Sequence, residues 1–385
     1  MNPRALYSAF DIFPSPKGAG MHIFQMSKAM FEYYNGGILF AIGNDKLPFY
    51  QNEENVHVYR FTSNKLNFLE RAEEFAIFLN QHLIEFDSIE LCHFRDIWSA
   101  MGILNSNKKY KTVFEVNALP SIELPFRFHS INASVMNKII ELENYSLKES
   151  DFIITPSLIT KNYLIKNRNI PKDKIEVITN GADLQEDLSK PSDSPERYII
   201  YFGALQKWQG IDVLLKAFSG LRDIEDLKLM ICSSNRENIS KEYIKLANRL
   251  EISEKIIWKY ALQREELYPY IQHAIASIAS LKECNRNLEQ GASPIKIFES
   301  LACSTPVIAS DIPIVREILI ENYNSKLVYP DRPLDLSRAI RFLVDSPEIC
   351  KTMRGNCYNT IKENYQWESK REELKQVYSK LRTFV

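Results

Sequence analysis

The sequence has 385 residues, more than one hydrophobic core usually organises, so it predicts two domains of similar size. Its 48 Lys and Arg residues nearly cancel its 49 Asp and Glu residues, which excludes the broad basic field of a nucleic-acid-binding protein. The apolar runs are too short to span a bilayer and the N-terminus has no signal-peptide pattern, so we expect a cytoplasmic protein. The six cysteines and six histidines lack the spacing of metal ligands, so we expect neither a bound metal ion nor another cofactor.

Short runs of β-forming residues alternate with helical stretches along the whole chain. This rhythm predicts parallel sheets covered on both faces by helices, in two doubly wound α/β domains. The expected strands of the first domain are 5–10, 37–42, 56–61, 89–94, 111–116 and 152–155. Those of the second domain are 198–202, 227–232, 256–260, 274–279 and 307–310.

A polar segment after Asn180 and Gly181 separates the two series of strands. These two residues form either a simple turn or a hinge. We therefore place the N-terminal domain at 1–183 and the C-terminal domain at 184–362. The tail at 363–385 carries apolar residues at helical spacing, which predicts an amphipathic helix that packs back on the N-terminal domain.

A glycine-rich turn with Gly18 and Gly20 follows the first expected strand and precedes a helix expected to begin near Met21. In open parallel sheets such turns let the backbone approach an anion, and the helix N-terminus stabilises its charge. The turn is either structural or part of a phosphate site. Ile23 stands where the dinucleotide fingerprint has its last glycine, which argues against a nicotinamide or flavin dehydrogenase.

A stronger signal for a ligand site lies at 291–310, where a helix is expected to precede the strand at 307–310. Ser293 suits the N-cap of this helix and Pro294 its first position. Lys296 and Glu299 are three residues apart and share one helix face. The lysine would bind the diphosphate of a nucleotide and the glutamate its ribose hydroxyls; alternatively, the two side chains form a surface ion pair.

Three residues of the N-terminal half join Lys296 as candidates for the chemical step. His93 and Arg95 lie at the end of one expected strand and Glu115 at the end of another, on the sheet edge where ligands bind. Each is either a catalytic side chain or a polar residue that caps a loop. No neighbouring Ser, His and Asp arrangement accompanies them, so nucleophilic hydrolysis is unsupported.

The N-terminal domain also contains a basic stretch at 161–174. Its five basic residues, set against Asp173, are Lys161, Lys166, Arg168, Lys172 and Lys174. The stretch is either a solvated helix face or a surface for weak peripheral contact with anionic lipid at the inner face of the membrane.

The segment at 291–310 resembles the donor-binding motif of glycosyltransferase family 4, in which two glutamates flank seven residues before a small-residue helix and a Pro-Val-Ile strand. Glu299 matches the second glutamate, which in that family holds the nucleotide ribose, and Gly291 stands at the position of the first. The resemblance covers nearly the whole chain. It includes the start of the C-terminal domain at 201–218, the Asn-Gly hinge at 178–183 and the Pro-Ser turn at 156–157.

The chain departs from the family pattern at 201–218, where Ala204 and Gln209 replace an arginine and a lysine that commonly hold the donor pyrophosphate. Gly203 matches the glycine of this segment in the donor site, and the Trp-Gln-Gly run resembles that of a variant subgroup. The candidates for supplying the missing charge are Lys207, Lys296, Arg286 and the backbone amides near Gly18 and Gly20.

The resemblance implies the GT-B architecture: two Rossmann-like domains facing each other across a cleft, with a C-terminal helix crossing back. It implies retaining, metal-independent transfer of a sugar from a UDP- or GDP-sugar in the C-terminal domain to an acceptor in the N-terminal domain. The acceptor would be a saccharide or lipid-linked molecule in the synthesis of cell-surface polysaccharide or glycoconjugate. Glu115 stands roughly where the family often has a histidine beside the reacting sugar. The alternatives are a nucleotide-sugar 2-epimerase of the same shape and a non-enzymatic two-domain ligand-binding protein.

Overall fold

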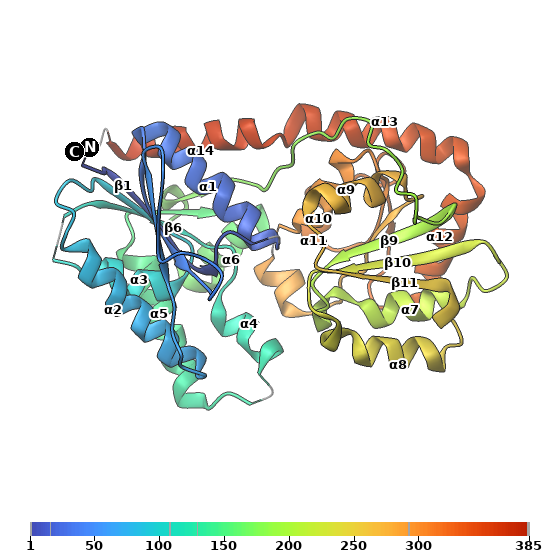
Figure 1. Cartoon of the computed structure of the whole chain (residues 1–385), viewed down its shortest axis with the longest axis horizontal. Helices are drawn as coiled ribbons and strands as arrows, with labels where there is room; N and C mark the ends of the chain where they lie inside the picture. The colour runs from blue at the N-terminus through green and yellow to red at the C-terminus, as the bar shows by residue number, and fades with distance from the viewer. Residues whose placement is uncertain (1, 16, 108, 129, 292, 383–385) are drawn as a thin grey trace. The chain divides into compact units, whose positions relative to one another are not determined.

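The structure is a computed structural model that describes residues 2–15, 17–107, 109–128, 130–291 and 293–382. These residues form two compact units, both drawn in Figure 1. The first unit contains 2–15, 19–179 and 368–382, and the second contains 17–18 and 180–367. Pro16 of the glycine turn, Ala292 of the donor motif and the last three residues of the tail lie outside the described residues.

In the described part of the chain, the first unit contains an eight-stranded sheet in the order β3-β4-β2-β1-β5-β6-β7-β8. Its strands are β1 (Ala5–Ile12), β2 (Gly37–Ile42), β3 (Tyr50–Glu53), β4 (Val56–Phe61), β5 (Leu91–Phe94), β6 (Lys111–Glu115), β7 (Phe152–Thr155) and β8 (Ile175–Val177). The strand order reverses between β1 and β5, because the chain leaves β1 toward β2 and later enters β5 on the other side. Ligands of open α/β sheets bind at the carboxyl ends of strands beside such a switch point.

The predicted parallel arrangement holds for the first sheet except at one edge, where an antiparallel strand is added. Strand β3 pairs antiparallel with β4, whereas the other neighbouring strands of this sheet pair in parallel. The reason is local, because only Glu54 and Asn55 separate the two strands, and Glu54 has a left-handed φ of +54°. A two-residue connection of this kind closes an antiparallel hairpin and cannot join parallel strands.

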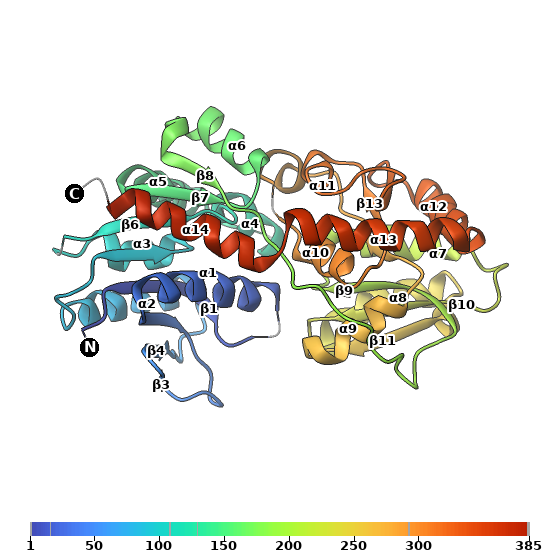
Figure 2. The ribbon, with the colours of Figure 1, turned by 90° about the horizontal axis from the view of Figure 1, so that it is seen from above.

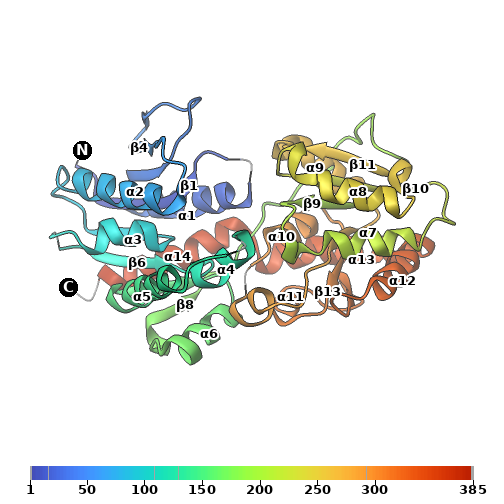
Figure 3. The ribbon, with the colours of Figure 1, turned by 90° about the horizontal axis from the view of Figure 1, so that it is seen from below.

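Helices cover both faces of this sheet. α1 (Gly18–Tyr34) and the C-terminal α14 (Trp367–Arg382) lie side by side on one face, as Figures 1 and 2 show. Arg371 of α14 donates to Oε1 of Gln25 at 2.7 Å, and Nζ of Lys375 lies 2.8 Å from Oε2 of Glu32. Figure 3 shows helices on the opposite face, which are α2 (Phe68–Leu83), α3 (Ile97–Leu104) and α5 (Ala133–Glu149). The remaining helices of the unit are α4 (Pro120–Arg127), α6 (Leu158–Arg168) and a 3₁₀ turn η1 (Lys172–Lys174).

The second unit contains a parallel six-stranded sheet in the order β11-β10-β9-β12-β13-β14. Its strands are β9 (Arg197–Gly203), β10 (Leu227–Ser233), β11 (Ile256–Tyr260), β12 (Ser277–Ala279), β13 (Val307–Ser310) and β14 (Ser325–Val328). Here the strand order reverses between β9 and β12. The carboxyl ends of these two strands are therefore the expected ligand edge of this unit.

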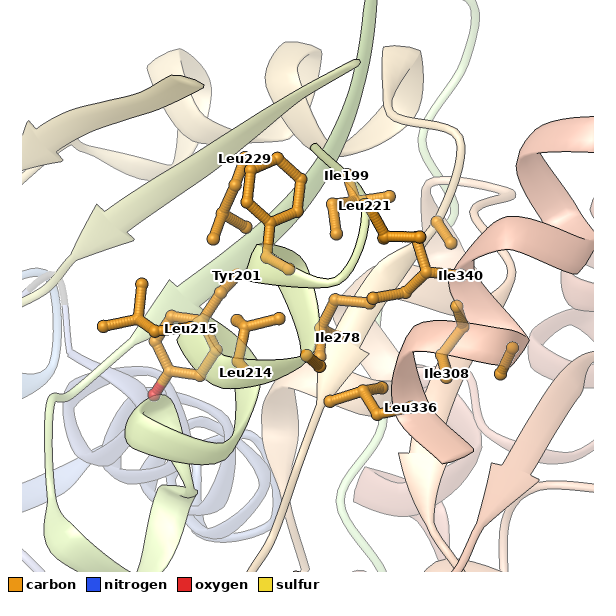
Figure 4. Close-up of a cluster of buried hydrophobic side chains, with 14 of the residues drawn as sticks. Ile199, Tyr201, Leu214, Leu215, Leu221, Leu229, Ile278, Ile308, Leu336 and Ile340 are labelled. Atoms are coloured by element: carbon orange, nitrogen blue, oxygen red, sulfur yellow. The ribbon is translucent and has the colours of Figure 1, made fainter. Parts of the chain in front are cut away.

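The second sheet is also covered on both faces (Figure 1). Helices α7 (Ile211–Ser219), α8 (Lys241–Arg249) and α12 (Pro333–Asp345) pack on one face, and α9 (Arg264–His273), α10 (Ile295–Ala302) and α13 (Pro347–Asn364) on the other. Figure 4 shows the larger core of this unit, in which Ile199 and Tyr201 of β9 meet Leu214 of α7 and Ile340 of α12. The shorter helical segments are η2 (Lys207–Gln209), η3 (Glu237–Ser240), η4 (Ser253–Lys255), the π-helical η5 (Arg286–Gln290) and α11 (Pro313–Arg316). Within the described residues, none of the helices is long and apolar enough to cross a bilayer.

Candidate functional site

The switch-point edge of the second sheet gathers polar side chains from three elements beside the end of β9. Strand β9 ends at Gly203, η2 contributes Gln209, α10 contributes Lys296 and Glu299, and α9 contributes Arg264. Gly203 has a φ of +114°, a conformation that favours glycine, and a Cβ added there would lie 3.6 Å from Nζ of Lys296. The absent side chain leaves the backbone open beside this ammonium group.

Lys296 is a buried lysine whose hydrogen-bond partner and ring contact are neutral side chains. Only 8% of its surface is exposed, its Nζ donates to Oε1 of Gln209 at 2.6 Å, and it lies 4.1 Å from the centroid of the Tyr201 ring. Burial lowers the pKa of Lys296 to about 7, and the charge of Glu299 offsets this only in part. Burying an ammonium group without a charged partner is costly. The arrangement therefore favours binding of an anion, which would compensate for the hydration that the ammonium group has lost.

The contact made by Gln209 shows what this residue does at one position where the chain departs from the family pattern. At the position where the family commonly has a lysine, its side chain instead accepts the hydrogen bond of Lys296. The other candidate cations are placed differently, since Lys207 is exposed and the guanidinium of Arg286 lies over the Trp208 ring at 4.7 Å. Of these three side chains, Lys296 is the buried one at the sheet edge.

Glu299 is held by α9, a contact that the sequence did not indicate. Its Oε1 lies 3.0 Å from Nε of Arg264 and accepts a longer hydrogen bond of 3.4 Å from Tyr268. Glu299 is 9% exposed, and its pairing with Arg264 differs from the solvent-exposed pair with Lys296 that was the alternative. A partly desolvated carboxylate with one oxygen already bound is suited to accept hydroxyl hydrogen bonds with the other.

The expected N-cap at Ser293 is wrong by one residue. Helix α10 begins at Ile295 with Pro294 in the N-cap position, where ψ is 98° and no side chain caps the helix. Because Pro294 has an extended conformation, the helix begins only after it. The carbonyl of Pro294 accepts a hydrogen bond from the backbone N–H of Ile297 at 2.9 Å. The carbonyl of Ser293 instead accepts from Nδ2 of Asn180 at 2.8 Å.

Gly18 and Gly20 occupy the first turn of α1, which therefore begins three residues before Met21. A Cβ on Gly20 would lie only 2.2 Å from the carbonyl oxygen of Ser15. The close approach of the turn explains why glycine is needed there, and the roles of both glycines in donor binding stay predictions.

In the first unit, the candidate residues His93 and Arg95 both lie beside the third, Glu115, at the end of β6. The side chain of Glu115 is 2% exposed, and its carboxylate accepts a 2.8 Å hydrogen bond from the Tyr7 hydroxyl and another from Asn117. Its oxygens lie 3.3 Å from Nε2 of His93 and 3.8 Å from Nε of Arg95. Burial alone would raise the pKa of Glu115, but the neighbouring His22, His93 and Arg95 lower it well below its usual range.

His93 is fully buried between Glu115 and the C-terminal helix, where its Nδ1 and the Tyr378 hydroxyl are 2.7 Å apart. Burial lowers its pKa, and the Glu115 carboxylate opposes this. His93 has no exposed surface in this arrangement and contacts Glu115 and Tyr378; its role in the chemical step stays a prediction. Arg95 is the more accessible of the three, and it also donates to the carbonyl of Ala19 at 3.1 Å.

Several residues of these two clusters were not predicted from the sequence. They are Tyr7, His22, Asn117, Arg264, Tyr268 and Tyr378. His22 had the clearest signal, because it lies one turn after Gly18 in the glycine-rich segment; its Nδ1 is 3.0 Å from Oε1 of Glu115. In the described part of the chain, no group of three or more His, Cys, Asp or Glu residues is arranged to hold a metal ion.

Three of the five basic side chains in the stretch at 161–174 bind groups within the first unit. Nζ of Lys161 donates to the carbonyl of Ile175, and Nζ of Lys174 donates to the carbonyls of Leu147 and Lys148. Arg168 pairs with the buried Glu143 at 2.6 Å. These contacts favour a structural role, as helix caps and a buried ion pair, over a lipid-binding face.

Two family models match the chain. Glycosyl transferases group 1 matches residues 185–360, and Glycosyltransferase Family 4 matches residues 16–186. The uncharacterized glycosyltransferase MJ1069 of Methanocaldococcus jannaschii is 22% identical, with 96% of each chain covered. The O-antigen chain mannosyltransferase RfbU of Salmonella typhimurium is 25% identical over 53% of this chain and 54% of its own length. The structure of Anabaena Alr3699/HepE in complex with UDP-glucose is similar with a TM-score of 0.74 at 14% identity, covering 98% of this chain and 99% of that one.

Proposed function

Because the chain belongs to the group 1 glycosyltransferases of family 4, nucleotide-sugar-dependent enzymes with the GT-B fold, we propose that it is a retaining transferase using a UDP- or GDP-sugar. The acceptor would be a saccharide or a lipid-linked saccharide in the synthesis of a cell-surface polysaccharide or glycoconjugate. The observation that carries the proposal is the buried Lys296 beside Glu299 at the switch-point edge of the second sheet. The UDP-glucose bound by Anabaena HepE and the O-antigen activity named for RfbU support these choices of donor and product.

The donor site has the groups that departure of a nucleotide diphosphate requires. As the bond between the anomeric carbon and the phosphate oxygen breaks, both electrons go to the oxygen and negative charge grows on the diphosphate. Lys296 and the N–H groups at the start of α10 would stabilise this charge in a site that excludes much of the water. Glu299, fixed by Arg264, would accept hydrogen bonds from the ribose hydroxyls.

Incubation with a panel of UDP- and GDP-sugars and a library of saccharide and lipid-linked acceptors, followed by mass spectrometry, tests the proposal. We expect a product heavier than one acceptor by one sugar residue, and nuclear magnetic resonance should show that it keeps the anomeric configuration of the donor. An inverted product would contradict retention. Conversion of UDP-N-acetylglucosamine to its 2-epimer without any acceptor would favour the epimerase instead.

Replacing Glu299 with glutamine should leave the fold intact and weaken nucleotide binding by about 1.5 to 3 kcal/mol, because a charge-assisted bond to ribose is lost. Calorimetry with UDP and GDP measures the change, and Glu265→Gln, on α9 and outside the site, is the control. Unchanged affinity in a folded Glu299→Gln protein would remove this residue from the donor site.

Turnover should survive EDTA, because we assign the phosphate charge to Lys296 and helix N–H groups and not to a divalent cation. Initial rates are compared before and after chelation, at equal ionic strength. A loss of activity that Mg²⁺ or Mn²⁺ restores would contradict this assignment.

A further inference from the structure

A small cavity lies in the first unit at the carboxyl ends of β1, β5 and β6. Its volume is about 150 Å³, well below the ~300 Å³ at which pockets for larger ligands begin. One wall is aromatic and is formed by Phe10, Phe68 and Trp98. The ring of Phe68 packs edge-on against both others, with centroid distances of 5.6 Å to Phe10 and 5.4 Å to Trp98.

The cavity is also lined by polar side chains that contact the buried Glu115. Arg95 and Asn117 both line the cavity, and both contact the Glu115 carboxylate. Glu115 itself does not line the cavity. It therefore acts as a positioning residue, which holds a guanidinium and an amide in fixed orientations facing the cavity.

The charged side chains around the cavity already have partners within the protein. Nη1 of Arg95 lies 3.7 Å from the Asp11 carboxylate, and Nη2 of Arg127 lies 3.6 Å from that of Glu123. A third carboxyl group, that of Asp96, accepts the backbone N–H groups of Phe10 and Ser99 at 2.7 Å each. Two cationic side chains thus face three acidic ones, so a phosphate or carboxylate ligand would meet repulsion as well as attraction.

We propose that this cavity binds one uncharged sugar unit of the acceptor, with the C–H face of the ring on Phe68 and hydroxyl groups hydrogen-bonded to Arg95 and Asn117. The inference rests on the proposed function, because it assigns the acceptor of the same transfer reaction. Aromatic rings and fixed hydrogen-bonding groups that line one small cavity match the chemistry of a sugar ring, which has apolar C–H faces and polar edges. In an extended acceptor, any phosphate or lipid would then lie outside this cavity.

Ligand-observed nuclear magnetic resonance with the full-length protein tests the proposal. The probes are methyl glycosides of glucose, galactose, mannose and N-acetylglucosamine, compared with glucose 6-phosphate and glucuronate. We expect at least one neutral glycoside to bind more tightly than both anionic sugars. Phe68→Ala and Phe68→Leu should both weaken its binding by about tenfold, because leucine keeps the apolar bulk and removes the ring face.

Phe49→Ala is the matched control, because Phe49 is an exposed phenylalanine of the same unit that does not line the cavity. It should bind the glycoside like the wild type, and thermal melts establish that each variant is folded. Tighter binding of the anionic sugars, or unchanged binding in both folded Phe68 variants, would overturn the proposal. Calorimetry with UDP distinguishes failure of the cavity assignment from failure of the proposed function. If the protein binds UDP but no neutral glycoside, only the cavity assignment is rejected. If it binds neither UDP nor a neutral glycoside, the proposed function is rejected as well.

Discussion

Replacing Lys296 with methionine should lower kcat/KM more than tenfold, which corresponds to over about 1.4 kcal/mol of transition-state stabilisation. Methionine keeps an unbranched apolar side chain and removes the ammonium group, which lies over the Tyr201 ring, donates to Gln209 and would face the leaving diphosphate. The effect should be large because Lys296 is buried, and electrostatic interactions are stronger where water is excluded. Steady-state kinetics with the identified donor measure the loss.

Lys207→Met is the matched control, because Lys207 lies in η2 close to Gln209 in sequence but is exposed to solvent. It should reduce kcat/KM less than Lys296→Met does, and thermal melts exclude unfolding of either variant. If Lys207 proves important and Lys296 does not, the diphosphate lies nearer to η2 than we have placed it.

The role of Lys296 can also be tested by the pH dependence of nucleotide binding in the wild type and in Lys296→Met. The pKa of Lys296 is about 7 in the free protein, and a bound diphosphate would raise it. As pH rises above 7, the free protein loses this proton and must regain it on binding, so affinity for UDP should fall, at most about tenfold per pH unit. In Lys296→Met the affinity should be lower at neutral pH and nearly independent of pH over the same range.

Much of the fold could be predicted from alternation alone, but the edge strands β3, β8 and β14 (Ser325–Val328) escaped prediction. β3 (Tyr50–Glu53) is an edge strand with mostly exposed side chains, and β8 (Ile175–Val177) has only three residues. Neither contains the buried apolar run that identifies a strand of a parallel sheet. β3 is positioned by pairing with β4, and β8 by pairing with β7. A local sequence pattern carries no information about such pairing.

The donor site was predictable where its residues share one helix. Lys296 and Glu299 are three residues apart, so helical geometry places both on one side of α10 without knowledge of the tertiary fold. Arg264 escaped prediction because its contact with Glu299 joins residues 35 positions apart, through the packing of α9 against α10. The N-cap at Ser293 failed for a related reason, since the carbonyl of that residue is engaged by Asn180.

The cluster around Glu115 shows what a strand-end pattern leaves out. Position at the carboxyl end of β6 indicated that the residue belongs to the site, and the structure does bring His93 and Arg95 to it. Burial was not predictable, because it results from Tyr378 of the C-terminal helix and His22 of α1 closing over the cluster. These two helices are far from Glu115 in sequence, so the burial of the cluster appears only in the fold.

Replacing Glu115 with glutamine should therefore destabilise the first unit by about 3 kcal/mol or more, because a buried charge is removed from beside Arg95. Glutamine keeps nearly the same shape, so the loss reports the charge and not a cavity. The melting temperature of this unit should fall by roughly 6 to 12 °C, at 2–4 °C per kcal/mol. Glu90→Gln is the control, because Glu90 pairs with Arg4 at 2.5 Å on the surface and should contribute less than about 1 kcal/mol.

Acidification supplies the decisive comparison between wild type and Glu115→Gln. The folded-state pKa of Glu115 lies well below the ordinary value of 4.5, so its carboxylate stabilises the fold fully above that value. This contribution is lost as pH falls through the folded-state pKa, where the wild-type side chain becomes neutral like glutamine. The difference in melting temperature should thus be constant from neutral pH down to about 5 and shrink below 4.5. A difference that stays the same at low pH, or that is no larger than that of Glu90→Gln, would show that the Glu115 charge does not hold the cluster together.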